Sequence, residues 1–216
     1  MDIIEVRFSV KGQTLPVRHG YSLYAALSRA IPALHAAEAA LSIGPINGDY
    51  LGKGLLRLNE RSYLRVRLPV NDIVVLLPLA GQALEVEGHK IRLGVPNVRA
   101  LSPSPTLGAR LVMMKVHGAA SPTPERFLNA VRRRLEEHGI QGEPSLPLRR
   151  FGPQTGQPYR RVLRVKEYTL VGYALQVAGL NPEDSIRLQA NCPFGKRRMG
   201  CGFFVPLKQE NRDEGV

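Results

Sequence analysis

A short segment near the carboxyl end combines glycine with positive charge. Its three glycines and three cations are Gly195, Lys196, Arg197, Arg198, Gly200 and Gly202. Glycine lets backbone amides approach an anion closely, and the cations add attraction for phosphate. The segment therefore predicts binding to an RNA or DNA backbone, while a basic surface loop with tight turns is the alternative. It is not a P-loop, because no Ser or Thr follows Lys196 and no helix is predicted after it.

Histidine is the residue type best suited to proton transfer near neutral pH, and the chain contains five. His35 follows the first predicted helix. From the residues alone, a catalytic acid or base and a partly buried structural histidine are equally supported there. His19 precedes the same helix and is the second candidate, with helix entry as its alternative. The three others, at positions 89, 117 and 138, are predicted to be structural.

No pattern of metal ligands occurs in the chain. There is no HExxH or CxxC spacing, and the two cysteines, Cys192 and Cys201, make neither a disulfide framework nor a four-ligand zinc site. We therefore expect no metal and no cofactor. The cysteine usage favours a reducing, cytoplasmic compartment. No apolar run approaches the roughly 18 residues of a membrane span, and the first residues carry no basic or apolar leader pattern.

The charge balance indicates a polyanionic partner. The 216 residues include 30 Lys plus Arg against 18 Asp plus Glu, a net charge of +12, and 23 of the cations are Arg. Arginine presents a planar fork that matches phosphate oxygens. The predicted RNA-binding arginines outside the glycine-rich segment are Arg126, Arg133, Arg160, Arg161 and Arg164. An Arg-rich surface without a partner is the alternative for any one of them.

Hydrophobic periodicity places these residues on elements. Strands are predicted at 4–10, 63–68, around a turn at Gly88, at 109–116, within 161–177 and at 201–207. Helices are predicted at 22–31, over part of 34–41, at 71–79, 123–138 and 181–189. In the strand at 63–68, the apolar residues are expected to face the core, with Arg65 and Arg67 exposed.

The order of strand, helix, strand, strand, helix, strand occurs twice. It predicts an α+β fold of two tandem ferredoxin-like (βαββαβ) domains, at residues 1–95 and 109–208. The stretch 96–108 holds three prolines without periodicity and is the predicted linker. The last residues, 209–216, are predicted to be a disordered tail.

Both ends of the chain resemble one family. The ending at 195–206 resembles the glycine-rich loop of the RAMP superfamily of CRISPR proteins. The opening, at 18–29 and 31–35, is similar to the Cas-six (Cas6) repeat-processing endoribonucleases, and among these to the MYXAN subtype. The glycine-rich ending alone indicates only the superfamily. The first helix with its following histidine points to the nuclease.

This resemblance implies a metal-independent endoribonuclease of CRISPR antiviral defence, which cleaves repeat RNA to mature guide RNAs. The 2′-hydroxyl attacks the adjacent phosphorus, giving a 2′,3′-cyclic phosphate and a 5′-hydroxyl. His35 matches the family's active-site histidine. The resemblance also makes Tyr24 a candidate near the scissile phosphate and Lys53 a candidate cation for the phosphorane. Core packing for Tyr24 and a solvated loop for Lys53 are the alternatives.

Two other functions remain open from the sequence. One is a non-catalytic RAMP-type subunit of a CRISPR effector complex that binds RNA without cutting it. The other is a general RNA-binding protein with tandem ferredoxin-like domains. The expected partner in every case is RNA, for the nuclease a repeat that forms a stem-loop. Effector-complex subunits are further candidate partners, and a monomer and a homodimer are both compatible with the sequence.

Overall fold

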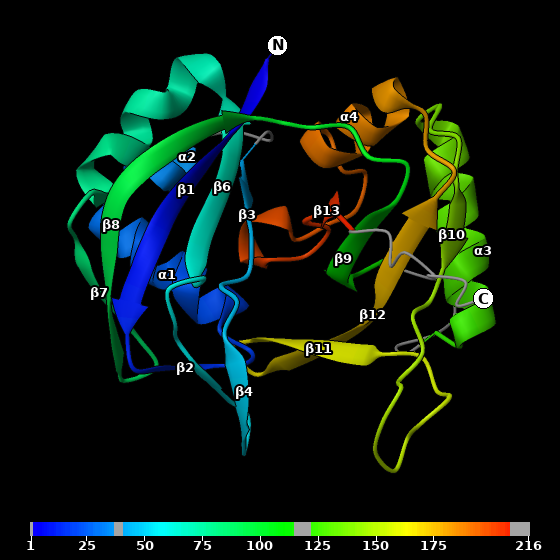
Figure 1. Ribbon diagram of the computed structural model, residues 1–216, viewed down its shortest axis with the longest axis horizontal. Helices are drawn as coiled ribbons and strands as arrows, with labels where there is room; N and C mark the ends of the chain where they lie inside the picture. Colours follow the sequence, from blue (N-terminus) through cyan, green and yellow to red (C-terminus); the bar gives the residue numbers. More distant parts are fainter. Residues whose placement is uncertain (1, 37–40, 115–121, 208–216) are drawn as a thin grey trace, which may run out of the picture.

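Two antiparallel sheets, one in each half of the chain, form the framework of the computed structural model (Figure 1). The structure describes residues 2–36, 41–114 and 122–207. The predicted tail at 209–216 lies outside these residues, as do the last two residues of the strand predicted at 109–116. Among the described residues, no helix combines the length and the apolar composition that crossing a membrane requires.

The N-terminal sheet has its first strand in the middle. Its strands are β1 (Ile3–Gly12), β3 (Ser42–Ile43), β6 (Tyr63–Pro69), β7 (Ala83–Val86) and β8 (His89–Ala100). They are hydrogen-bonded in the order β3-β6-β1-β8-β7. Val6, Phe8 and Val10 alternate along β1 and are buried, and Val6 pairs with Val66 on one side and Val98 on the other. The alternation thus confirms the predicted first strand.

Three helical segments share one core with this sheet. They are α1 (Gly20–Ala30), α2 (Ala33–Ala36) and the 3-10 helix η1 (Val70–Leu79). The helix α1 begins two residues before its predicted start at residue 22, and the Ser22 hydroxyl donates a hydrogen bond to the Glu87 carboxylate. The predicted helix at 71–79 has 3-10 geometry, with Pro78 near its end, where proline lacks a backbone donor.

A third, smaller sheet was not predicted. It contains β2 (Thr14–Pro16), β4 (Asp49–Gly52) and β5 (Leu55–Arg57), in the order β2-β5-β4. The tip between β4 and β5 has positive φ at Gly52, Lys53 and Gly54. Strands of three or four residues are too short to show a period in the sequence, so this hairpin carried no strand signal.

The C-terminal sheet repeats the arrangement of the first. Its strands are β9 (Leu107–Val112), β10 (Glu143–Ser145), β11 (Arg160–Val165), β12 (Tyr168–Ala178) and β13 (Val205–Pro206). The order is β10-β12-β9-β13, and β11 pairs with β12. In the first sheet β1 lies between β6 and β8, and in the second sheet β9 lies in the same way between β12 and β13. The strands β11 and β12 confirm the strand prediction within 161–177.

The helices of this half, α3 (Pro124–Glu137) and α4 (Pro182–Ala190), end within a residue of their predicted limits. Thr123 caps α3 by accepting a hydrogen bond from the Arg126 backbone N–H, and Pro124 occupies the first helical position. Phe127, Val131 and Leu135 recur every four residues along α3 and are buried, as the apolar face of this helix. Asn181 caps α4 in the same way, through the Asp184 backbone N–H.

Two predicted segments are shorter than expected. The strand β8 extends to Ala100, so the segment between the sheets is 101–106 rather than 96–108. Most of the end of β8 is exposed, which removes the alternation that would have marked it as a strand. The closing strand predicted at 201–207 is reduced to Val205–Pro206, because Gly200 and Gly202 have positive φ and interrupt an extended conformation.

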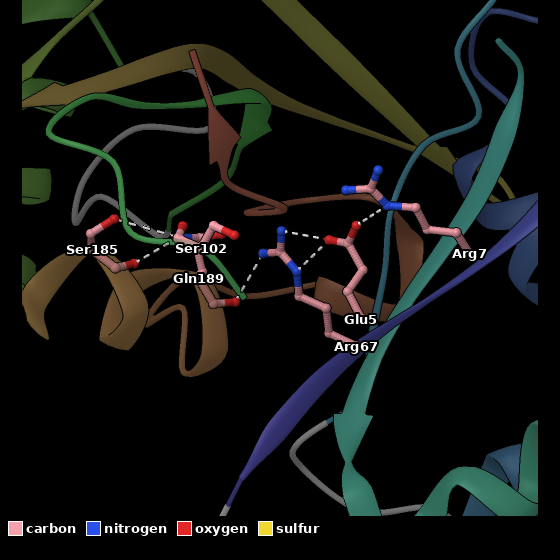
Figure 2. A network of polar contacts seen from close by, with 6 residues as sticks. All are labelled: Glu5, Arg7, Arg67, Ser102, Ser185 and Gln189. Carbon is pink, nitrogen blue, oxygen red and sulfur yellow. Dashed lines mark hydrogen bonds and ion pairs between the residues drawn. The ribbon is translucent and has the colours of Figure 1, made fainter. Parts of the chain in front are cut away.

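The two halves are joined by a buried polar network (Figure 2). Arg67 forms an ion pair with Glu5 at 2.8 Å and donates a hydrogen bond to the Gln189 carbonyl oxygen of α4 at 3.0 Å. The Gln189 amide donates in turn to the Ser102 carbonyl oxygen at 2.8 Å, which attaches the connecting segment to α4. The prediction that Arg67 is exposed is wrong: its side chain is 2% exposed, because the C-terminal half covers that face of β6.

Candidate functional site

A cleft of about 1310 Å³ lies between the two halves. The β4–β5 hairpin and the residues before α1 form one wall, and β9, β11 and the loop before β11 form the other. Among the described residues, seven Lys or Arg side chains and a single carboxylate, Glu87, line it. The seven cations are Arg18, Lys53, Arg110, Arg149, Arg160, Arg161 and Arg164. A concave surface with this excess of positive charge attracts polyanions.

The cleft brings together part of the predicted set of binding residues. Lys53, Arg160, Arg161 and Arg164 all line it. Arg126 and Arg133 do not, because they lie on α3, at the outer side of the C-terminal sheet (Figure 1). The helical periodicity located these two arginines correctly on one element, but it carried no information about which face of the protein that element occupies.

The glycine-rich segment forms a tight turn beside the cleft. Its centre is a single 3-10 turn, η2 (Arg197–Met199), with left-handed backbone at Lys196 and Gly200 on either side. A Cβ at Gly202 would lie 2.5 Å from the Cys192 sulfur, so this glycine serves internal packing. A Cβ at Gly195 would meet no atom within 4 Å. Of the three glycines in this segment, only Gly195 thus has open space where a side chain would be.

The start of α1 contacts this turn directly. A Cβ on Gly20 would lie 2.3 Å from the Met199 carbonyl oxygen, so only glycine permits the approach. Four residues later, the Tyr24 hydroxyl accepts a hydrogen bond from the Arg198 guanidinium at 3.4 Å. Tyr24 is also part of the N-terminal core. The structure thereby brings Tyr24 and Arg198 together, although 174 positions separate them in the chain.

His19 is buried at the edge of the cleft, with both ring nitrogens engaged. The Ile46 backbone N–H donates to Nε2 at 3.0 Å, so Nδ1 carries the proton that is donated to the Pro16 carbonyl oxygen at 2.6 Å. Burial, together with the nearby charge of Arg110, lowers the pKa of His19 to about 4, although the hydrogen bond to the Pro16 carbonyl oxygen acts in the opposite direction. The ring is therefore neutral at neutral pH and joins the chain before α1 to the chain after β3.

The other histidines are placed as follows. The backbone of His35 lies in α2, directly after α1 and Pro32, and its side chain is outside the described part of the structure. The His89 ring is hydrogen-bonded to the Thr14 hydroxyl at 2.8 Å, and the His138 ring to the Arg134 carbonyl oxygen at 2.9 Å. His117 lies outside the described residues.

Arg110 and Tyr159 are among the cleft residues that the sequence analysis did not single out. Arg110 lies on β9 between the buried Ala109 and Leu111, so strand alternation alone would have marked it as facing away from the core. Tyr159 lies in the cleft between Pro158 and Arg160. Within the described ranges, no three His, Cys, Asp or Glu side chains gather in a group that could hold a metal ion.

The chain matches one protein family, one named relative and several solved structures. The family model described as Cas6 Crispr matches residues 4–209. A CRISPR-associated endonuclease Cas6 from Myxococcus xanthus (strain DK1622) is 36% identical over 206 residues, which are 95% of this chain and 82% of that protein. Two solved structures share the fold at low identity. One is a CRISPR-associated protein Cas6, with a TM-score of 0.63 and 12% identity over 96% of this chain and 99% of that one. The other is described as a RAMP protein binding different RNA substrates, with a TM-score of 0.60 and 13% identity over 96% of this chain and 100% of that one.

Proposed function

The chain belongs to the Cas6 family of CRISPR-associated proteins, and from this premise we propose that it is an endoribonuclease that cleaves CRISPR repeat RNA into mature guide RNAs. The observation that carries the proposal is the cleft between the two halves, where seven cations face one carboxylate among the described residues. The phosphates of an RNA backbone are the matching charge. The curated relative from Myxococcus xanthus is named an endonuclease, which supports cleavage over binding alone.

The proposed chemistry needs only proton transfers and charge stabilisation. The 2′-oxygen forms a bond to phosphorus while the bond from phosphorus to the 5′-oxygen breaks. A base takes the proton of the 2′-hydroxyl, and an acid gives a proton to the departing 5′-oxygen. The products are a 2′,3′-cyclic phosphate and a 5′-hydroxyl, and no metal ion takes part.

We assign one of the two proton transfers to His35, because it matches the family's histidine and follows α1. His19 is the less suitable candidate, since both of its nitrogens already bind the backbone. Lys53, at the tip of the β4–β5 hairpin, lines the cleft and is the proposed cation for the phosphorane. Tyr24 is proposed to act near the scissile phosphate, with its hydroxyl hydrogen-bonded to Arg198.

Each half is proposed to be a ferredoxin-like domain. A ferredoxin-like domain has four strands along the chain, in the order strand, helix, strand, strand, helix, strand. Within its sheet, these strands are expected side by side in the order second, third, first, fourth. The orders β3-β6-β1-β8 and β10-β12-β9-β13 both follow it, with β7 added at one edge of the first sheet. The segment 101–106 then connects the two domains, and the cleft lies between them.

A cleavage assay tests the proposal. Labelled repeat RNA is incubated with the wild type and with His35→Ala in EDTA, and His138→Ala serves as the control because His138 is exposed at the end of α3. We expect the wild type and the control to cleave and His35→Ala to lose about 10²- to 10⁴-fold in rate. Unchanged cleavage by His35→Ala would refute the assignment of His35. A requirement for magnesium would refute the mechanism, and binding without cleavage by the wild type would indicate a non-catalytic RAMP-type subunit.

A competition experiment separates repeat processing from general RNA binding. Unlabelled repeat RNA and a scrambled hairpin of equal length compete for the protein at one stated salt concentration. Electrostatic attraction alone treats the two equally, so equal competition would support a general RNA-binding protein. We expect the repeat to compete better.

A further inference from the structure

Three arginines meet on the floor of the cleft without a negative partner. Arg110 lies on β9, Arg161 on β11, and Arg149 in the loop that precedes β11. Burial lowers the pKa of both Arg110 and Arg161, and in each case a neighbouring arginine lowers it further: Arg161 acts on Arg110, and Arg149 acts on Arg161. The Arg161 guanidinium is thus close enough to both Arg110 and Arg149 for their positive charges to repel.

Their hydrogen-bonding capacity is not used up within the protein. The Nε atoms of Arg149 and Arg161 are buried without a partner among the described residues. Arg110 donates one hydrogen bond, to the Val17 carbonyl oxygen at 3.2 Å. In the described ranges no carboxylate forms an ion pair with any of the three, and Glu87, which also lines the cleft, binds the Ser22 hydroxyl. Buried donors of this kind are costly unless a ligand accepts from them.

The Tyr159 ring explains how two like charges stay near each other. The guanidinium carbons of Arg149 and Arg161 lie 5.2 and 5.0 Å from its centroid. The negative face of an aromatic ring attracts a cation at this distance and lessens the cost of bringing the two charges together. The ring is neutral, so it leaves the positive charge of the pair intact.

The backbone holds this group in place. The Arg149 backbone exchanges two hydrogen bonds of 2.9 Å across its loop, one with Gln157 and one with Gly156. The Tyr159 N–H donates to the Pro147 carbonyl oxygen at 3.1 Å, and its own carbonyl oxygen accepts from Ala174 on β12 at 2.9 Å. The backbone at Arg149 and Tyr159 is therefore held by hydrogen bonds within the protein, without a ligand.

We propose that Arg110, Arg149 and Arg161 form a binding site for one phosphodiester group of the RNA, and that Tyr159 is the positioning residue that sets the two guanidiniums Arg149 and Arg161. Several planar donor groups facing one point match the oxygens of a phosphate. The identity of the ligand as RNA rests on the proposed function. The anion site itself rests on the three arginines.

Salt-dependent binding tests the site. The probe is repeat RNA carrying 2′-O-methyl groups throughout, so that it binds without being cleaved, and the proteins are the wild type, Arg149→Gln, Arg161→Gln and Arg92→Gln. Arg92 is exposed on β8 outside the cleft and serves as the charge-matched control. We expect each cleft variant to bind about 10- to 100-fold more weakly than the control and to lower the slope of log Kd against log salt by about 1. Affinity and slope equal to those of Arg92→Gln would overturn the proposal.

The role of Tyr159 has its own test. Tyr159→Phe keeps the aromatic face and is expected to bind the probe as the wild type does, whereas Tyr159→Leu is expected to bind it about tenfold more weakly at an unchanged melting temperature. Equal affinity of the two variants would remove Tyr159 from the proposal.

If the wild type binds no RNA, so that the proposed function fails, inorganic pyrophosphate replaces the probe. A larger increase in melting temperature on addition of pyrophosphate for the wild type than for Arg161→Gln then supports the anion site. Equal increases in the two proteins overturn it.

Discussion

The guanidinium of Arg67 lies 4.1 Å from the centroid of the Phe203 ring, across the boundary between the two halves. Arg67 belongs to β6, and Phe203 follows the glycine-rich turn. The chain at Gly44 also packs closely on this ring, because a Cβ on Gly44 would lie 3.0 Å from one of its atoms. One buried side chain thus connects the N-terminal sheet, the end of α4 and the segment after η2, so the two walls of the cleft are held in a defined relation.

Removing Arg67 is expected to destabilise the protein strongly. Arg67→Met leaves the Glu5 carboxylate buried without its main partner, and loss of one member of a buried ion pair costs about 3–5 kcal/mol. The free energy of unfolding, measured in urea, is the readout. Arg57→Met is the control, because the pair between Arg57 and Asp49 is exposed and is expected to contribute at most about 1 kcal/mol. Equal losses in the two variants would show that the buried network is not a major contribution to stability.

The pH dependence of this network follows from Glu5. Burial raises the pKa of Glu5, but the charges of Arg67 and Arg7 outweigh it, so the pKa lies below the ordinary value of 4.5. The stabilisation is then complete above pH 4.5 and is lost as the pH falls through the folded-state pKa. The difference in unfolding free energy between the wild type and Glu5→Gln should stay constant from neutral pH to about 4.5 and decrease only below it. A difference that shrinks already between pH 7 and 5 would contradict this.

Local signals predicted the elements better than the site. The helix α3 was predicted closely because its cap, its proline and its apolar stripe lie within 15 residues of one another. The burial of Arg67 was missed because β6 alternates like a strand with one exposed face, and the cover on that face comes from residues 122 positions away. The contact between Tyr24 and Arg198 was missed for the same reason, because 174 positions separate the two residues in the chain. The glycine-rich ending and the first helix could be identified separately, but their meeting depends on how the two halves pack.

His19 should produce a separate loss of stability in mild acid. Burial lowers its pKa from 6.5 to about 4, so the folded protein favours the neutral ring and the unfolded chain binds the proton more readily. The stabilisation is complete above pH 6.5 and decreases as the pH falls towards 4, by an amount on the order of 3 kcal/mol. The wild type and His138→Gln should show this slope in urea unfolding at a series of pH values. His19→Gln should lack it, and a slope retained in that variant would assign the effect to another group.

The contact between α1 and the glycine-rich turn can be tested at one atom. In Gly20→Ala, the new methyl group would lie 2.3 Å from the Met199 carbonyl oxygen, so the helix and the turn must move apart. Overpacking of this kind costs about 1–3 kcal/mol. We expect a lower free energy of unfolding and slower cleavage of repeat RNA, because the hydrogen bond between Tyr24 and Arg198 spans the same contact.

Gly195→Ala is the matched comparison for Gly20→Ala, since its methyl group would enter open space. It should leave the free energy of unfolding unchanged. If the backbone at Gly195 approaches a phosphate, however, the methyl group would obstruct the RNA, and the affinity for repeat RNA should fall without any loss of stability. An effect of Gly20→Ala on neither stability nor cleavage would show that the turn can shift freely away from α1. The cleavage site would then have to be organised without that contact.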